Sequence, residues 1–275
     1  MSDNQISTST LIGPLKQVRV GGVGFLRLSV LFAGMPEHDC AHIASAAVRR
    51  TFARRETIFT QGQEVRNLIL LQSGNAKHVQ VSPDGDEALI RISSPGDIVC
   101  VAGLSSVRRH TCSGCATEDC RALVWEHDQI QSYLGLYPRL GLNMTRILAS
   151  QLSELEVRYR EVATERLTRR LASLLLRLSK QIGKQSGNGT QIRLSQEEIA
   201  QMVGSTVFSI SRVLSRWSRL GLILTSREAV VVWDPERLEL IDGIRVAAGA
   251  KTTTSSSLFR NQGLSSSGKI SVSAE

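Results

Sequence analysis

The sequence predicts an α+β chain in which an N-terminal antiparallel β-roll is followed by a long helix and a C-terminal winged helix-turn-helix. Three observations support this fold class. Residues 56–126 alternate short apolar runs with turns rich in glycine, proline and aspartate, as in an antiparallel barrel or roll. From Pro138 onward, apolar residues recur at spacings of three and four. Residues 195–220 form two short amphipathic patterns separated by Gly204.

Ahead of the roll, the segment from Pro36 to Phe52 has helical spacing, with Ile43, Ala47 and Val48 on one side. We therefore predict a helix over that segment. Residues 1–24 are polar and dotted with glycine, and residues 250–275 contain eight serines and three threonines. Both ends have little to bury, so we predict that they are disordered.

The long helix that begins at Pro138 presents an apolar seam with heptad spacing. Such a seam either pairs with a second copy of the chain or lies on the protein's own roll. The unbroken length favours a homodimer helix. The predicted dimerisation residues are Leu148, Leu152, Leu155, Tyr159 and Val162.

Residues 195–204 carry the signals for the first short helix. Ser195 followed by Glu198 is a capping box, in which each side chain binds a backbone N–H of the other residue. Gly204 can adopt the left-handed conformation that ends a helix, and Ser205 or Thr206 can cap the next one. This layout is typical of a helix-turn-helix.

The second short helix separates into an apolar and a polar face at 100° per residue. Ile210, Leu214 and Trp217 share the apolar face, while Phe208 and Arg212 lie opposite. A helix fits the major groove of DNA, where arginine can bind guanine and an apolar ring can contact a thymine methyl group. The alternative is that the arginines only solvate a surface helix. The predicted DNA-contacting residues are Ser195, Gln196, Ser205, Thr206, Val207, Phe208, Ser209, Arg212 and Arg216.

Charge and the following segment support the DNA-binding interpretation. Residues 165–220 hold ten Lys or Arg against three Asp or Glu, which is +7 of the chain's total +8. Such a concentration of positive charge suits a phosphate backbone. Residues 222–233 resemble a β-hairpin that would form the wing, residues 190–194 are short enough to be its third strand, and Asp234-Pro235 begins a closing helix.

The composition excludes several other classes of protein. No stretch of about 18 apolar residues is present, so we expect no membrane partner, and the polar start differs from a signal sequence. Five cysteines, an odd number, argue for reduced thiols rather than a disulfide framework. We therefore expect a cytoplasmic regulator and not an enzyme.

The order of small helix, β-roll, long helix and winged helix-turn-helix resembles the bacterial family of cyclic-AMP receptor and fumarate-nitrate regulators. The resemblance covers roughly residues 30–242. Its motifs are Leu31-Phe-Ala-Gly-Met-Pro-Glu, Ile58-Phe-Thr-Gln-Gly, Ser94-Pro-Gly-Asp-Ile, Ile199-Ala-Gln-Met-Val-Gly and Ser211-Arg-Val-Leu. The resemblance implies a homodimeric transcription factor that binds a two-fold related site on double-stranded DNA, and that contacts RNA polymerase if it is an activator.

Under this resemblance the expected domains are an N-terminal extension (1–29), a β-roll sensor domain of cyclic-nucleotide-binding type (30–136), a dimerisation helix (137–164), a winged helix-turn-helix DNA-binding domain (165–242) and a Ser-rich tail (243–275). Arg212 matches the family's base-reading arginine. Val207 and Phe208 stand where the family commonly has arginine and glutamate. We therefore expect a half-site preference that differs from those of the well-known members.

The roll departs from the cyclic-nucleotide binders of the family. Those proteins use a glutamate for the ribose hydroxyl and an arginine for the cyclic phosphate, and the matching places here are Cys100-Val101 and His110-Thr111. Valine cannot accept a hydroxyl hydrogen, and neutral imidazole does not replace a bidentate guanidinium. We therefore expect a signal other than cyclic AMP. Arg108 and Arg109 can hold another anion or simply be solvated loop residues.

The cysteines at 100, 112, 115 and 120 allow several interpretations. Such spacing can bind zinc or an iron–sulfur cluster, can form a thiol switch, or can be the small apolar residues of a roll interior. If residues 117–118 form a tight turn, Cys115 faces Cys120 across a hairpin, whereas Cys112 points to the other face. The alternative function is therefore a thiol- or metal-dependent redox protein that uses Cys112, Cys115 and Cys120. No metal site is predicted outright.

Overall fold

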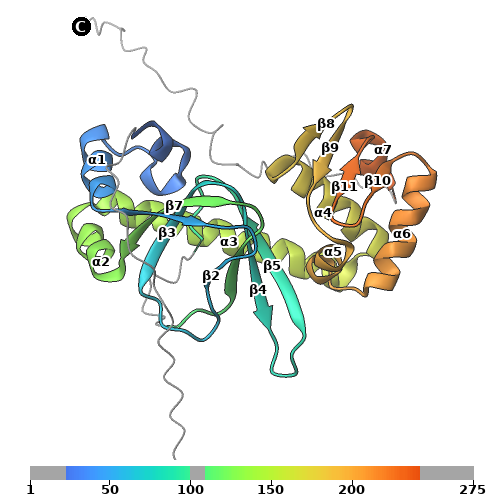
Figure 1. Cartoon of the computed structure of the whole chain (residues 1–275), viewed down its shortest axis with the longest axis horizontal. Helices are drawn as coiled ribbons and strands as arrows, with labels where there is room; N and C mark the ends of the chain where they lie inside the picture. Colours follow the sequence, from blue (N-terminus) through green and yellow to red (C-terminus); the bar gives the residue numbers. More distant parts are fainter. Residues whose placement is uncertain (1–22, 100–108, 242–275) are drawn as a thin grey trace, which may run out of the picture.

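The structure, a computed structural model, describes residues 23–99 and 109–241. A β-roll, a long helix and a winged helix domain follow one another along the chain (Figure 1). The predicted α+β fold class is confirmed. Cys100, Val101, Arg108 and both predicted disordered ends, apart from residues 23–24, lie outside the described residues.

Two antiparallel sheets form the roll. The first has the order β1-β7-β3, with β1 at Val48–Phe52, β7 at Cys120–Glu126 and β3 at Asn67–Ser73. The second has the order β2-β6-β4-β5, with β2 at Thr57–Phe59, β6 at Ser113–Ala116, β4 at Ala76–Val81 and β5 at Glu87–Ser93. Alternate side chains point inward from both sheets, so Phe52, Leu71 and Ala116 bury a shared core.

Helical segments cover the outer face of the first sheet. They are the 3-10 turns η1 (Val23–Leu28) and η2 (Val30–Phe32) and the helices α1 (Glu37–Ser45) and α2 (His127–Leu136). Trp125 is buried at the centre of this layer, and its indole N–H donates to the backbone oxygen of Ile43 over 2.7 Å. A buried indole needs such a partner, so this contact fixes α1 against the sheet.

The predicted helix from Pro36 to Phe52 is wrong in its second half. The helix ends at Ser45, and Val48–Phe52 forms β1, which pairs with β7 in the register Val48 with Val124 and Phe52 with Cys120. Helical spacing cannot reveal that residues 48–52 gain their backbone partners from a strand some 70 residues later, because strand pairing is decided by the fold and not by local spacing.

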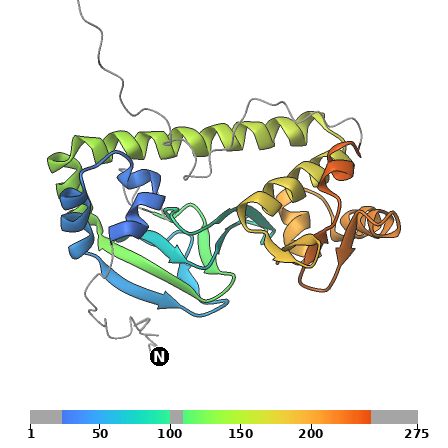
Figure 2. The same cartoon turned by 90° about the horizontal axis from the view of Figure 1, so that it is seen from above.

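The long helix α3 (Pro138–Thr164) confirms the predicted unbroken helix after Pro138. Pro138 is at its first turn, where proline needs no backbone N–H. The buried amide of Asn143 donates to the backbone oxygens of Leu31 and Ala33, each over 2.9 Å, and joins the helix to the roll. Figure 2 shows α3 running along both domains, so one element carries the roll and the winged helix.

The winged helix domain combines α4 (Leu167–Gln181), α5 (Gln196–Val203), α6 (Val207–Arg219) and α7 (Pro235–Glu239) with one sheet. Its strand order is β10-β11-β9-β8, with β10 at Ile223–Thr225, β11 at Val230–Val232, β9 at Gly189–Ile192 and β8 at Lys184–Ser186. The predicted wing, its third strand and the closing helix are confirmed. The fourth strand, β8, was not predicted.

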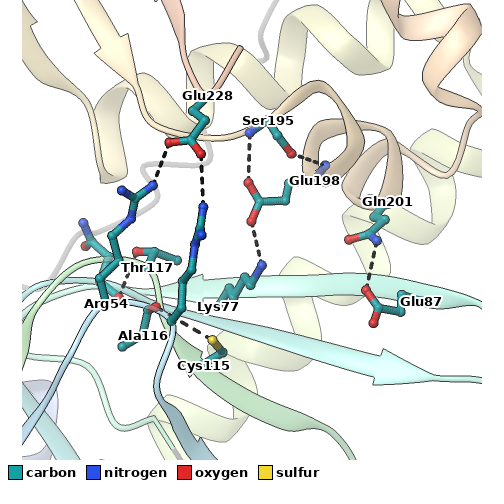
Figure 3. A network of polar contacts seen from close by, with 12 residues as sticks. Arg54, Lys77, Glu87, Cys115, Ala116, Thr117, Ser195, Glu198, Gln201 and Glu228 are labelled. Atoms are coloured by element: carbon teal, nitrogen blue, oxygen red, sulfur yellow. Dashed lines mark hydrogen bonds and ion pairs between the residues drawn. The ribbon is translucent and has the colours of Figure 1, made fainter.

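The winged helix domain packs directly on the roll. Ile92 of β5 is buried in the same apolar cluster as the helices of the winged helix domain. Figure 3 shows the polar contacts around this packing: Lys77 Nζ is 2.7 Å from Glu198 Oε1, and Arg54 and Arg55 both bind Glu228 of the wing turn. Lys184 also binds Glu118 over 2.5 Å. Helix α5 therefore touches both the roll and the rest of its own domain.

Glu198 has two partners at once, and this predicts a measurable stability effect. Burial by itself would raise the pKa of Glu198, but hydrogen bonds from Lys77 and Ser195 outweigh it and leave that pKa below the usual value. Glu198→Gln keeps the capping acceptor but loses the ion pair, so the free energy of unfolding should fall by about 0.5–1 kcal/mol near pH 7. Urea denaturation followed by circular dichroism measures it.

The pH dependence of the same variant gives a further check. A carboxylate with a lowered folded-state pKa stabilises the fold above its unfolded pKa of about 4.3, and this stabilisation is lost as the pH falls through the folded value. The difference between wild type and Glu198→Gln should therefore shrink below about pH 4.3. Glu197→Gln, an exposed neighbour with the same charge change, is the control. Equal effects of the two substitutions would contradict the interdomain ion pair.

Candidate nucleic-acid interface and sensor cavity

The first helix of the helix-turn-helix begins as predicted. Ser195 Oγ accepts from the backbone N–H of Glu198 over 3.1 Å, and the Glu198 carboxylate accepts from the backbone N–H of Ser195 over 2.9 Å. Gly204 has φ +69°, which is the left-handed conformation expected at the helix end. The capping box and the glycine stop are confirmed, and they set the angle at which the chain enters the next helix.

Helix α6 also divides as predicted. Thr206 is its N-cap, and the hydroxyl of Thr206 accepts from the backbone N–H of Ser209 over 3.2 Å. Ile210, Leu214 and Trp217 are buried in the domain core. The opposite face, which carries Phe208 and Arg212, points away from the domain core. The amphipathic pattern therefore exposes the residues that were predicted to contact DNA.

The solvent face of α6 carries an aromatic ring and three cations. Phe208 is 72% exposed, and the guanidinium carbon of Arg212 lies 5.7 Å from the centre of its ring. Residues four apart on a helix are neighbours on its surface, and a cation over a ring is attracted to it. Arg216 and Arg219 are exposed farther along the helix. The surface therefore offers positive charge and apolar area together.

The other predicted DNA-contacting residues lie at the starts of the two helices. Thr206, Val207 and Ser209 surround the N-terminus of α6, next to Phe208. Ser195 and Gln196 are half-buried at the start of α5, where the Glu198 carboxylate meets Lys77 of the roll. The structure brings the α6 residues together on one exposed surface. The start of α5 faces the roll instead.

The predicted dimerisation residues form an exposed row on α3. Leu148, Leu152, Leu155, Tyr159 and Val162 are between 46% and 76% exposed. Apolar side chains recurring at heptad spacing with this exposure are an uncovered helix seam. Within the described residues, the seam is mostly exposed rather than packed on the chain's own roll, which was the alternative interpretation.

A cavity of about 290 Å³ lies between the roll and α3. Phe59, Ile90 and Val99 contribute apolar walls from the roll, and Leu152 and Leu155 contribute them from α3. The polar lining residues are His78, Arg91, His110, Thr111, Cys112, Gln151, Glu154 and Arg158. Arg158 donates to the backbone oxygen of Ile90, and burial lowers its pKa. The cavity can take a small molecule with apolar area and some negative charge.

Several of these cavity residues were not predicted. Phe59 belongs to the Ile58-Phe-Thr-Gln-Gly motif, but that motif was used only as a mark of resemblance. His78 and Arg91 come from β4 and β5, and Arg158 lies between seam positions of α3. The available signal for His78, Arg91 and Arg158 was a polar or charged residue within an apolar strand or beside an apolar seam.

His110 and its neighbours stand where the resemblance implies residues that bind a cyclic nucleotide, and not all of them reach the cavity. His110 is buried and stacks on Phe59, with ring centres 4.3 Å apart, and burial lowers its pKa. His110, Thr111 and Cys112 line the cavity. Arg109 instead directs its guanidinium to the backbone oxygen of Gly62 over 2.7 Å. His110 therefore presents an imidazole to the cavity at the position where the resemblance implies a phosphate-binding arginine.

The predicted meeting of Cys115 and Cys120 is wrong. Cys115 is on β6 of the second sheet, opposite Thr57 and Lys77, whereas Cys120 is on β7 of the first sheet, opposite Phe52. The turn after Ala116 passes the chain from one sheet to the other, so β6 and β7 do not form a hairpin. Cys112 lines the cavity and Cys115 does not, which agrees with the predicted alternation.

The cysteines at 112, 115 and 120 are free thiols in buried or half-buried places. Burial raises the pKa of Cys112, of Cys115 and of Cys120. For Cys120, nearby Glu118 and Asp119 raise it further, and its pKa reaches about 11. Cys120 donates to the backbone oxygens of Glu118 and Asn75. Within residues 23–99 and 109–241, no group of three or more His, Cys, Asp or Glu side chains is arranged to hold a metal ion. These observations favour buried thiols over a redox centre.

The described residues include no helix that is both long and apolar enough to cross a membrane. The fold and its exposed basic helix are those of a winged helix DNA-binding protein that carries an antiparallel β-roll. Models of two domain families match the chain: the cyclic nucleotide-binding domain over residues 49–136 and the Crp-like helix-turn-helix domain over residues 169–241.

Known proteins extend this likeness to most of the chain. Transcriptional regulator LdrP of Thermus thermophilus is 31% identical over 196 residues, which are 69% of this chain and 94% of that protein. The CRP-like cAMP-activated global transcriptional regulator of Mycobacterium tuberculosis is 27% identical over 210 residues, 76% of this chain and 94% of that protein. A solved CRP-family regulator, also from Thermus thermophilus, is 28% identical with a TM-score of 0.61, covering 69% of this chain and 94% of its own. The chain belongs to the CRP/FNR family of DNA-binding transcriptional regulators.

The buried state of Cys120 predicts slow chemistry at this thiol. Because its pKa is about 11, the thiolate fraction at pH 7.5 is about 100-fold below that of a free cysteine. Iodoacetamide should therefore label Cys120 slowly in the folded protein, faster as the pH rises, and fully in 6 M urea. Peptide mass spectrometry measures the labelling. Rapid labelling at pH 7.5, or a disulfide between Cys115 and Cys120 after mild oxidation, would restore the redox alternative.

Proposed function

We propose that this regulator acts as a homodimer that places two copies of α6 in successive major grooves of a two-fold related operator. The observation that carries the proposal is the exposed face of α6, where Phe208 and the arginines are held outward by a buried apolar face. Recognition helices of such dimers sit one helical turn of DNA apart, about 34 Å. The exposed seam on α3 supplies the surface for pairing the two copies.

The proposed DNA contacts divide by chemistry. Arg212, Phe208, Val207 and Ser209 would meet base edges from the first turns of α6, because the N-terminal residues of a recognition helix lie deepest in the groove. Ser195, Gln196, Ser205, Thr206 and Arg216 would contact phosphates, which fix the position of the protein on the duplex. Phosphate binding at the start of α5 would require the roll contact of Lys77 with Glu198 to open, since that end is occupied here.

The proposed domains are those expected from the sequence: the sensor roll at 30–136, the dimerisation helix at 137–164 and the DNA-binding domain at 165–242. The signal would act in the cavity between roll and α3, and it would be a ligand other than cyclic AMP. Support for this comes from His110 and Thr111 in the cavity wall, where the family resemblance implies an arginine. As a regulator of DNA the protein would work in the cytoplasm, would contact RNA polymerase if it activates, and would not be an enzyme.

Arg212→Ala tests the DNA-binding role of α6. If the guanidinium forms a fork with a guanine, its loss should weaken specific binding by about 1–3 kcal/mol and relax the base preference at one position of each half-site. Fluorescence anisotropy on the upstream DNA, with excess non-specific competitor, measures the affinity. Arg66→Ala, an exposed arginine of the roll, is the control. An unchanged sequence preference would remove Arg212 from base reading.

Leu155→Glu tests the proposed dimer. A carboxylate at the centre of the seam would face its own copy across the two-fold axis, so the dimer should dissociate and specific DNA binding should fall with it. Sedimentation velocity measures the mass. Val157→Glu is the matched control, because Val157 is also exposed on α3 but lies about 200° around the helix from Leu155. A dimer that survives Leu155→Glu and not Val157→Glu would place the interface on the other face.

A further inference from the structure

Phe208 places an exposed aromatic ring on the solvent face of α6, and burying that ring against a partner would be favourable. It lies in the first turn of α6, it is 72% exposed, and its neighbour Val207 is 44% exposed. Exposed apolar area is common on proteins, but here two apolar residues begin the helix that is proposed to enter the groove. The exposed face of α6 therefore begins with the apolar residues Val207 and Phe208 and continues with Arg212 one turn later.

The chemistry of the major groove limits what such a ring can recognise. A phenyl group neither donates nor accepts a conventional hydrogen bond, and in the groove only thymine presents a methyl group. Guanine instead presents two acceptors, O6 and N7, which match the fork of a guanidinium. We propose that Phe208 reads a thymine methyl group and that Arg212, seated on the same ring, reads a guanine close by in the same half-site. This inference rests on the proposed function.

The spacing of the two residues fixes how close the two bases are. Residues 208 and 212 are about 6 Å apart along the helix axis, since each residue rises by about 1.5 Å. Successive base pairs are about 3.4 Å apart, so the thymine should lie within two base pairs of the guanine.

The contact between the two side chains makes the two readings dependent on each other. The Arg212 guanidinium carbon is 5.7 Å from the centre of the Phe208 ring, and a cation over a ring is attracted to its face. The ring therefore restrains the long arginine side chain before DNA arrives, which lowers the entropy lost on binding. Removing the ring should weaken the thymine reading and the guanine reading together. Leucine at position 208 would keep an apolar contact with the methyl group but would lose the contact between the ring and the Arg212 guanidinium.

The experiment begins with in vitro selection of binding sites from a random duplex pool with the full-length protein. The selected half-site should contain a guanine with a thymine within two base pairs. Each thymine is then replaced by deoxyuridine, which removes only the methyl group, and affinity is measured by fluorescence anisotropy. Burying one methyl group corresponds to about a four-fold change in affinity. Wild type should lose about that factor at one thymine, and at none in the spacer between half-sites.

Variants then assign the effect. Phe208→Ala should bind deoxyuridine and thymine sites equally and discriminate less against loss of guanine N7, tested with 7-deazaguanine. Phe208→Leu should stay sensitive to the methyl group while discriminating guanine less. Leu220→Ala, at the exposed leucine that caps the C-terminal end of α6, should behave as wild type.

Two results would overturn the inference on its own. One is specific binding by wild type with no deoxyuridine effect, and the other is a deoxyuridine effect that persists unchanged in Phe208→Ala. Failure of the proposed function gives a different result: no sequence would be enriched at all, and the methyl reading would fall with it.

Discussion

The carboxylate of Glu198 is the one group that both starts a helix of the DNA-binding domain and binds the roll. One oxygen binds the backbone of Ser195 and starts α5, and the other binds Lys77 of the roll. The helix that supports α6 is thus formed and docked by the same side chain. Ile92 of the roll is also buried among the helices, and Glu228 and Lys184 bind the roll as well, so the position of the DNA-binding domain is set by this charge pair together with packing and those contacts.

Helix α3 connects the other two functional surfaces. Leu152 and Leu155 are members of the exposed seam and also line the cavity between roll and helix. Any molecule in the cavity would therefore contact residues that the proposed partner copy contacts as well. Occupancy of the cavity and the geometry of pairing would then be coupled through shared side chains rather than through a distant path.

The helix-turn-helix could be predicted almost completely from sequence, because its signals are local. A serine and a glutamate three residues apart, a glycine at the helix end and an alternation of faces need no knowledge of the rest of the chain. The exposed position of Phe208 followed from the same periodicity. The family resemblance predicted the order of roll, long helix and winged helix, but it did not predict which side chains contact one another, such as Lys77 and Glu198.

The roll was less predictable, because its contacts are distant in sequence. Residues 48–52 have helical spacing but pair with β7, and Cys115 and Cys120 are five residues apart yet lie in different sheets. The cavity brings Phe59, His78 and Arg158 together from three elements. Such juxtapositions arise from the topology of the sheets and are not encoded in any one window of sequence.

Pairing through the uncovered seam on α3 would also make the abundance of the chain part of its response. If two copies must pair before they bind an operator, then well below the pairing constant the amount of dimer rises with the square of chain concentration. About a two-fold change in expression would give about a four-fold change in operator occupancy in that range. Gene dosage and the synthesis rate of the regulator would therefore be amplified at its promoters, even at a fixed level of signal.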